Sequence, residues 1–240
     1  MQKLFVDFVP EGTFALDEEQ SRHIARSLRM RVGDMLTLTC GDGSDYGCII
    51  DKIDSNLVTL TVCYKQANNS EPDVRVTLYQ GVPKGDKTED IIQKCTELGI
   101  SRVVPVLTHR SVSRPDDKSA GKKQARYQKI ALEASQQSGR GIVPEISPME
   151  TLSNAVKKDD SRLKIIFYEG GGEPIRSLVS SEIKTVSIYI GPEGGVEKDE
   201  VELIKANGGA VATLGKRILR TQTAPVAALT AIMLLTGNLE

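Results

Sequence analysis

Histidine and cysteine are scarce in this sequence, and their scarcity argues against a metal centre. The 240 residues include two histidines and four cysteines. The cysteines form no Cys-x-x-Cys pair of the kind that indicates a zinc site or a redox motif. We therefore expect no bound metal and four reduced thiols, at Cys40, Cys48, Cys63 and Cys95.

A strong net charge and a long hydrophobic run are absent as well. The formal net charge is −1, so any RNA contact must come from local clusters of Lys and Arg. The most apolar stretch, Val226–Leu235, is too short to cross a bilayer, and the first residues contain no long apolar signal core. We expect a cytoplasmic protein without membrane contact. Its hydrophobic content of 39% supports one or two domains with a sizeable core.

The common nucleotide-binding fingerprints do not occur. The glycines of Gly191-Pro-Glu-Gly194-Gly195 lack the G-x-G-x-x-G spacing, and no Gly-Lys-Ser/Thr follows as a P-loop requires. A plain Rossmann domain or P-loop ATPase is therefore not supported.

Two glycine-containing loops, each after a predicted buried strand, form the strongest candidate for a ligand site. The strand Val186–Ile190 must end at Gly191 and Pro192, because proline fixes φ and lacks the N–H that a strand ladder needs. Gly191, Gly194 and Gly195 permit positive φ and leave backbone amides uncovered. A flat or charged ligand could therefore approach the main chain closely.

The second loop follows the predicted strand Ala210–Leu214, begins with Gly215 and leads into a closing helix, Ala224–Leu235. A lone glycine cluster is more simply interpreted as a turn, but two such loops could face one ligand. The closing helix is apolar nearly all round, so it must be buried on more than one side, which predicts a homodimer. An internal core helix is the alternative.

A small β module is predicted near the amino terminus. Short strands at Met35–Cys40, Tyr46–Ile53 and Leu57–Tyr64 are joined by tight turns, which is typical of a small barrel or sandwich. The polar, proline-containing segment Lys65–Asp73 is predicted to be a linker. The expected domains are residues 1–67 and 74–240.

The segment Asp17–Arg29 is predicted to be a helix with Ile24, Ser27 and Leu28 on its buried face. Its arginines recur at i, i+4 and i+7, a row suited to a phosphate backbone. Complementing the helix dipole would explain the last of them but not all three. The expected RNA contacts of this domain are Arg22, Arg26, Arg29 and Arg31.

The second domain is predicted to be α/β. Val74–Val82 and Ile100–Leu107 are predicted strands on either side of the helix Thr88–Leu98, an order that implies a parallel pair joined by a crossover. Another buried strand, Leu163–Tyr168, ends at a glycine-rich loop. A second basic surface is expected where Arg110 and Arg114 precede a helix rich in Lys and Arg, although that helix face could equally be a solvated one.

Several motifs resemble those of the SPOUT methyltransferases, specifically the family that methylates N3 of a uracil in bacterial 16S ribosomal RNA. Its members carry IGPEGG followed by LG-x-RILRTETA, and this chain has IGPEGG at 190–195 and LGKRILRTQTA at 214–224. The resemblance covers nearly the whole chain, including Lys84-Gly-Asp, Gln93–Gly99 and Gln137–Arg140.

The resemblance implies an α/β trefoil-knot domain preceded by a PUA-like β-barrel RNA-binding domain. It also implies S-adenosylmethionine as cofactor, a homodimer, and as target uracil 1498 of 16S ribosomal RNA, within the small ribosomal subunit. It adds Lys84 and Arg140 to the RNA contacts. The cofactor-binding residues that it implies are Tyr168, Glu169, Gly191, Pro192, Gly194, Gly195, Leu214, Gly215, Ile218 and Leu219.

The implied reaction needs no covalent cysteine, because methyl transfer from a sulfonium is an in-line displacement that depends on holding donor and acceptor in place. Uracil N3 carries a proton at neutral pH, so a base must remove it or a cation must stabilise the anion left behind. Glu193 and Glu169 are candidate bases, and a glutamate in a tight turn is more often merely solvated. Arg220 is the stronger catalytic candidate, since its guanidinium could pair with a phosphate or a uracil anion.

The chain departs from the family pattern at Gln222, where relatives usually have Glu. Glutamine cannot take up a proton as a carboxylate does, so either this position is structural, as a cap of the closing helix, or the chain is impaired or acts on another substrate. We favour a structural role. The alternatives to the leading hypothesis are a knotted methyltransferase with another target, such as a tRNA ribose, and a non-catalytic RNA-binding protein that retains the fold.

Overall fold

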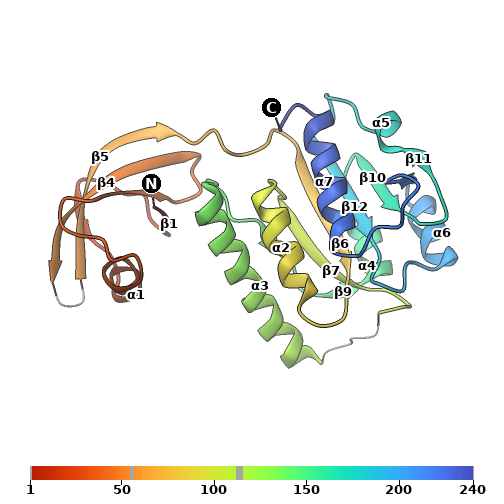
Figure 1. Ribbon diagram of the computed structural model, residues 1–240, viewed down its shortest axis with the longest axis horizontal. Coiled ribbons are helices and arrows are strands. Elements are labelled where there is room, and N and C mark those ends of the chain that lie inside the picture. Colours follow the sequence, from red (N-terminus) through yellow and green to blue (C-terminus); the bar gives the residue numbers. More distant parts are fainter. Residues whose placement is uncertain (1, 55–56, 112–115, 240) are drawn as a thin grey trace. The chain divides into compact units, whose positions relative to one another are not determined.

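The computed structural model describes residues 2–54, 57–111 and 116–239 (Figure 1). The chain divides into two compact units. The first contains Met1–Glu71 and Ser135–Val143, and the second contains Pro72–Ala134 and Pro144–Glu240.

The first unit contains a five-stranded sheet with the order β1-β3-β4-β5-β2. Its strands are β1 (Lys3–Phe5), β2 (Thr13–Ala15), β3 (Met35–Thr39), β4 (Ser44–Asp54) and β5 (Leu57–Ala67). Only β1 and β3 pair in parallel; the other neighbours are antiparallel. Leu36, Leu38, Ile50 and Leu60 are completely buried, because alternate side chains of each strand point to one face. The three predicted strands are confirmed.

The predicted helix Asp17–Arg29 is only partly correct. It consists of α1 (Glu18–Arg22) followed by a π-helix, η1 (His23–Ser27), and Arg29 has a positive φ of 54°. Ile24 is buried as predicted, but Ser27 is exposed. Ser21 is buried instead, because its hydroxyl donates to the Leu16 carbonyl and accepts the amide of Val58. The change of helix type moves residues after His23 out of α-helical register.

The last turn of α3 (Asp117–Ser138) and the residues after it differ from the predicted domain division. Ser135–Val143 belongs to the first unit, although it was expected in the second domain. The buried Lys3 donates to the Gly139 carbonyl at 2.8 Å, and the Glu71 carboxylate accepts the amides of Gly141 and Ile142. The predicted linker is also shorter than expected, since β5 continues to Ala67.

The second unit is built on an eight-stranded sheet in which every neighbouring pair is parallel. The strand order is β11-β13-β10-β12-β6-β7-β8, and β9 also pairs with β7. The strands are β6 (Arg75–Gly81), β7 (Arg102–Leu107), β8 (Glu145–Ile146), β9 (Glu150–Thr151), β10 (Leu163–Phe167), β11 (Glu173–Pro174), β12 (Thr185–Ile190) and β13 (Gly209–Thr213). The predicted α/β architecture and crossover are confirmed.

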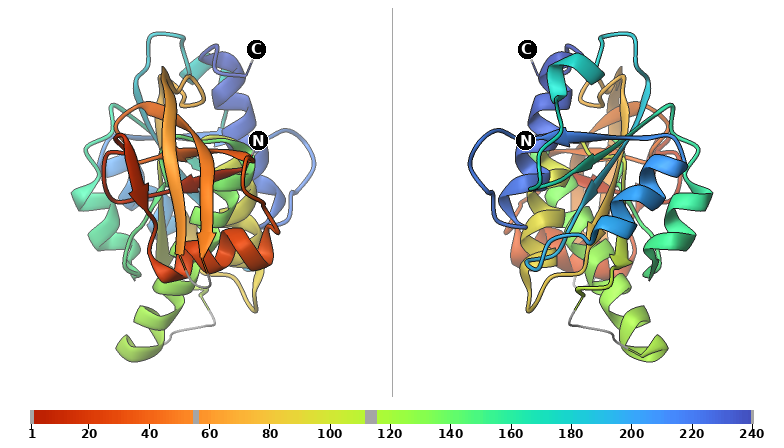
Figure 2. Two further views of the ribbon diagram at one scale, coloured as in Figure 1. Left: turned by 90° about the vertical axis from the view of Figure 1, so that its left-hand side faces the viewer. Right: turned by 90° about the vertical axis from the view of Figure 1, so that its right-hand side faces the viewer.

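Helices cover both faces of this sheet. The helix α2 (Lys87–Glu97) packs with α7 (Thr223–Leu235) on one face, and α4 (Leu152–Lys158) packs with α6 (Lys198–Ala206) on the other (Figure 2). A short helix, α5 (Ile175–Leu178), follows β11. No helix in the described part of the chain is both long and apolar enough to span a membrane.

The end of the chain returns to the middle of the sheet. After β13, the segment 214–222 leads into α7, which packs on β12 and β6. Parallel neighbours place their carboxyl ends at one edge, so the loops after β10, β12 and β13 lie close together.

Candidate functional site

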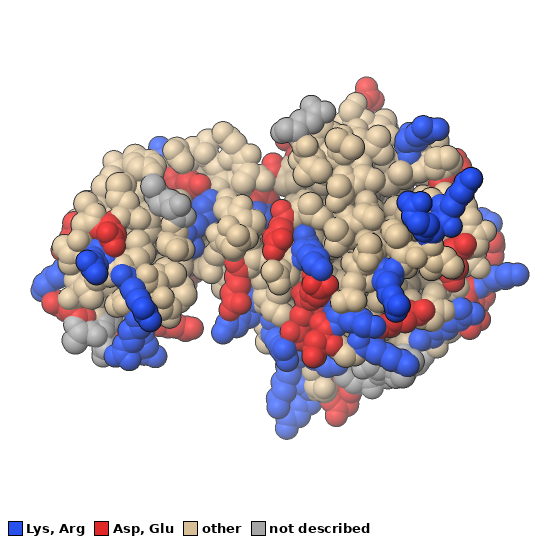
Figure 3. Space-filling model, in the orientation of Figure 1, with Lys and Arg blue, Asp and Glu red and all other residues tan. Residues whose placement is uncertain are grey.

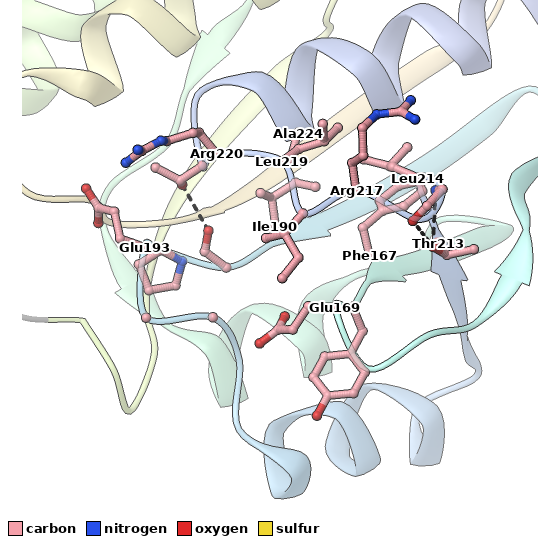
Figure 4. Close-up of a pocket in the computed structure, with 18 of the residues that line it drawn as sticks. Phe167, Glu169, Ile190, Glu193, Thr213, Leu214, Arg217, Leu219, Arg220 and Ala224 are labelled. Carbon is pink, nitrogen blue, oxygen red and sulfur yellow. Dashed lines mark hydrogen bonds between the residues drawn. The ribbon is translucent and has the colours of Figure 1, made fainter.

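A cavity of about 480 Å³ lies at the carboxyl ends of β10, β12 and β13. Its residues come from the ends of these strands, the loops that follow them and the start of α7. Every residue predicted to bind the cofactor or to act in catalysis lines this cavity (Figure 4). Segments separated by about fifty residues in sequence therefore form one site.

The loop after β12 needs glycine most strongly at Gly195. Of its three glycines, only Gly195 has a positive φ, 75°, and a Cβ there would lie 2.2 Å from Oε1 of Glu169. A Cβ on Gly194 would instead lie 3.2 Å from the Arg110 side chain. The sequence allows a positive φ at all three glycines, and Gly191 and Gly194 do not adopt one. Close packing, and not φ, restricts those two positions.

The loop after β13 is held by a local hydrogen-bond pair. The Gly215 amide donates to the Thr213 hydroxyl at 3.2 Å, and this hydroxyl donates to the Gly215 carbonyl at 3.1 Å. Gly215 has a φ of 102°. Further along the loop, the Ile218 side chain is 85% exposed, which is unusual for a large apolar residue.

Glu193 and Arg220 lie on the same side of the cavity in Figure 4. Both carboxylate oxygens of Glu193 accept the Lys84 amide at 3.3 Å, and one also forms an ion pair with Lys87. Burial alone would raise the pKa of Glu193, but these hydrogen bonds outweigh burial and lower its pKa below the ordinary value. A carboxylate held ionised in this way is a weak base.

Gln222 does not cap α7 with its side chain, contrary to the expected role. It occupies the position before the helix without a side-chain cap hydrogen bond. Its Nε2 instead donates to Oδ2 of Asp90 on α2, at 3.2 Å. The position therefore links two helices.

The predicted RNA-binding arginines of the first unit are all on its surface. Arg22, Arg26, Arg29 and Arg31 are exposed, and Arg22 lies 3.8 Å from Glu18. Figure 3 shows basic side chains mixed with fewer acidic ones around α1. The π-helix breaks the expected i, i+4, i+7 row, because Arg29 follows the helix in a left-handed conformation.

The RNA contacts predicted outside that cluster have different outcomes. Lys84 is exposed. Arg110 donates to the Gly194 carbonyl at 2.5 Å and pairs with Glu197, so it supports the loop after β12. The prediction for Arg140 is wrong, because its guanidinium is buried and held by the Glu71 carboxylate at 2.6 and 3.2 Å. Arg114 lies outside the described residues.

Several lining residues were not predicted. Strand ends could have indicated Phe167, Ile190 and Thr213, since ligands bind beyond the carboxyl ends of parallel strands. Lys216, Arg217, Thr221 and Ala224 belong to the second motif but had been given no role.

The cysteines and the possible metal ligands lie outside the cavity in the described part of the chain. All four cysteines are free, and burial raises the pKa of Cys48 to about 11 and of Cys95 to about 12, so both are neutral thiols. One group, formed by His109, Glu197 and Asp199, brings possible ligand atoms within 4.8 Å. Glu197 already pairs with Arg110 and caps α6.

Comparison with known proteins agrees with this geometry. Residues 70–233 match the family model described as an RNA methyltransferase domain, and residues 16–63 match an RNA methyltransferase PUA domain. The ribosomal RNA small subunit methyltransferase E of Bacillus subtilis is 36% identical over 245 residues, which cover 97% of this chain and 96% of that protein. The chain belongs to the ribosomal RNA small subunit methyltransferase E family. It is an RNA methyltransferase.

Two solved structures extend the comparison to the fold. A putative methyltransferase from Legionella pneumophila, in complex with the bound cofactor SAM, is 28% identical with a TM-score of 0.89, over 97% of this chain and 96% of that one. The ribosomal RNA small subunit methyltransferase E from Neisseria gonorrhoeae, bound to S-adenosyl methionine, is 28% identical with a TM-score of 0.89, over 98% of each chain. The expected α/β trefoil-knot (SPOUT) domain and PUA-like amino-terminal domain are confirmed.

Proposed function

We propose that this enzyme transfers a methyl group from S-adenosylmethionine to N3 of uracil 1498 in 16S ribosomal RNA. The observation that carries the proposal is the convergence of both family motifs and the end of β10 on one cavity. Its volume of about 480 Å³ suits a cofactor, since small-molecule pockets span roughly 300–1,000 Å³.

The residues of the cavity fit this cofactor chemically. Phe167, Ile190, Leu214 and Leu219 supply apolar surface for a flat base. The loops 191–195 and 214–219 would hold the cofactor through main-chain groups, because glycines leave the backbone uncovered. Tyr168 and Glu169 would form the part of the cofactor pocket next to Gly195. When bound, the cofactor supplies a methyl group made electrophilic by a sulfonium sulfur.

Arg220 is the proposed catalytic residue. Its guanidinium carries a positive charge and can stabilise the negative charge that uracil gains when its N3 proton passes to solvent water. Glu193 keeps its negative charge because Lys87 and the Lys84 amide stabilise it. Its proposed role is to hold the segment before α2 beside the cavity.

The proposed RNA contacts are Arg22, Arg26, Arg29 and Arg31 on the first unit and, separately, Lys84 on the second. These exposed side chains have the charge and reach needed for phosphate contacts. The proposed substrate is the RNA within the small ribosomal subunit.

A homodimer is also proposed. Within one copy of the chain, five residues of α7 are buried, but Leu234 remains 55% exposed. A second copy would cover this apolar surface and that of Ile218.

Methyl transfer by the purified enzyme tests the proposal. Small subunits and, in a separate reaction, tRNA from a strain that lacks this modification are incubated with labelled S-adenosylmethionine, and the RNA is digested and mapped by mass spectrometry. We expect one N3-methyluridine in 16S RNA and none after Arg220→Ala. A ribose methyl group in tRNA would instead favour the hypothesis of a knotted methyltransferase that acts on tRNA.

A further inference from the structure

A buried chain of hydrogen bonds joins three segments next to the cavity. Gln80, completely buried near the end of β6, donates from Nε2 to the hydroxyl of Thr221 at 3.1 Å. The Thr221 hydroxyl donates to the Gly191 carbonyl at 3.0 Å. Gln80 thus bonds directly to the loop after β13, and Thr221 links it to the loop after β12.

The direction of this chain is fixed by the donors and acceptors available. The second amide hydrogen of Gln80 is used by the Gly81 carbonyl at 3.0 Å, and turning the amide over would place two oxygens against each other. Thr221 must therefore accept from Gln80. Its single hydroxyl hydrogen is then free to donate to Gly191.

The same contact positions the proposed catalytic arginine. Thr221 directly follows Arg220, and the Arg220 carbonyl accepts the amides of Thr223 and Ala224 at 2.8 and 2.9 Å. Arg220 is thus held on one side by the first turn of α7 and on the other by Thr221. Displacing Thr221 would move the Arg220 backbone and the Gly191 loop together.

The end of β6 also packs tightly against that loop. A Cβ on Gly81 would lie 2.5 Å from Cδ of Pro192 and 2.7 Å from its backbone nitrogen. The Gln80–Thr221–Gly191 chain therefore crosses an interface with no spare room, so a small shift in one segment is passed to the other two.

We propose that Gln80 and Thr221 are positioning residues, which hold the two cofactor loops and Arg220 in register through the Gly191 carbonyl. This inference rests on the proposed function, because it assigns the loops to cofactor binding. Neither side chain needs to touch the reacting atoms. Losing the Thr221 hydroxyl would leave the buried Gln80 hydrogen and the Gly191 carbonyl without their partner, which is costly in a buried setting.

The test compares Thr221→Val, which removes the hydroxyl at nearly constant shape, with Thr221→Ser, which keeps it. Thr236→Val is the matched control, because it removes a threonine hydroxyl bonded to the Ile232 carbonyl at 2.7 Å at the far end of the same helix. Calorimetry measures the affinity for S-adenosylmethionine. Hydrogen exchange without cofactor measures opening at Gly195, whose amide bonds to the Pro192 carbonyl at 2.9 Å.

We expect Thr221→Val to weaken cofactor affinity by roughly tenfold and to speed exchange at Gly195 by a similar factor. Thr221→Ser and Thr236→Val should stay within about threefold of the wild type. Unchanged exchange and affinity in Thr221→Val would overturn the proposal, as would equal losses in the Val and Ser variants. The exchange measurement does not depend on the cofactor, so failure of wild-type S-adenosylmethionine binding would contradict the proposed function alone.

Discussion

Gln222 on the approach to α7 donates a hydrogen bond to Asp90 on α2, with 3.2 Å between Nε2 and Oδ2. Asp90 also pairs with Lys94 at 2.8 Å, one turn further along its helix. A glutamate at 222 would place a second negative charge next to Asp90. In this chain, glutamine therefore suits its neighbour, and the departure from the family motif needs no loss of activity to explain it.

Gln222→Glu should accordingly lower stability without restoring or abolishing activity. We expect the free energy of unfolding to fall by about 0.5–1 kcal/mol at pH 7, because like charges face each other at a partly buried site. The methyl-transfer rate should stay within about threefold. Denaturant unfolding and single-turnover kinetics measure the two quantities. A tenfold faster reaction would show instead that a carboxylate at this position takes part in the chemistry.

Gly195→Ala should abolish cofactor binding. The new Cβ would clash with the Glu169 carboxylate. The alanine would also have to adopt the left-handed backbone conformation, which costs about 1–2 kcal/mol for a residue other than glycine. Gly208→Ala is the control, because Gly208 has a similar φ of 83° with nothing within 4 Å of the added Cβ. Calorimetry should show loss of S-adenosylmethionine binding in the first variant only. Equal affinity in both would remove the Gly195 loop from the cofactor site.

Arg29→Gly should separate RNA binding from folding. Glycine relieves the left-handed strain at φ 54° but adds chain entropy to the unfolded state, so stability should be unchanged or rise by up to about 1 kcal/mol. RNA affinity should fall. The slope of log affinity against log salt concentration should decrease by the amount expected for about one phosphate contact. Arg29→Asn, which tolerates the same backbone, should reproduce the RNA effect. Stability lower by more than 1 kcal/mol with unchanged RNA binding would make Arg29 a structural residue.

The ion pair between Lys87 and Glu193 should give a pH-dependent contribution to stability. The pKa of Glu193 is lowered in the folded state from an ordinary value of 4.5, so the contribution is complete above that pH and is lost as the pH falls through the folded pKa. At pH 7 the midpoint of thermal unfolding should therefore be lower for Lys87→Gln than for the wild type. The two midpoints should converge in acid below about pH 4.5. A difference that persists unchanged at pH 3 would show that Lys87 stabilises the fold in another way.

The lining of the cavity could be predicted from sequence because its motifs are local. Each loop directly follows a buried strand, and a parallel sheet brings such strand ends to one edge. Gly195 was recognised as part of a binding loop, but its special φ could not be distinguished from that of Gly194. The contact that leaves no room for a Cβ at Gly195 comes from Glu169, which follows another strand.

The RNA side was harder to predict because charge in a sequence does not reveal its partner. Arg140 belongs to a short Gly-Arg-Gly stretch, yet its side chain is buried and forms an ion pair with Glu71, which is distant in sequence. The predicted arginine row assumed an α-helix, and the π-helix at His23–Ser27 gives no signal in hydrophobic spacing. The Gln80–Thr221 contact depends on the path of the chain through the knotted domain, which local patterns do not contain.

The most direct test of the central claim is mass spectrometry of 16S ribosomal RNA from a strain in which this gene is deleted and then restored. The account predicts that the methyl group on N3 of uracil 1498 is lost on deletion. It should return with the wild-type gene but not with the Gly195→Ala or Arg220→Ala variants. Full methylation of that uracil in the deletion strain, or its restoration by Gly195→Ala, would contradict the account.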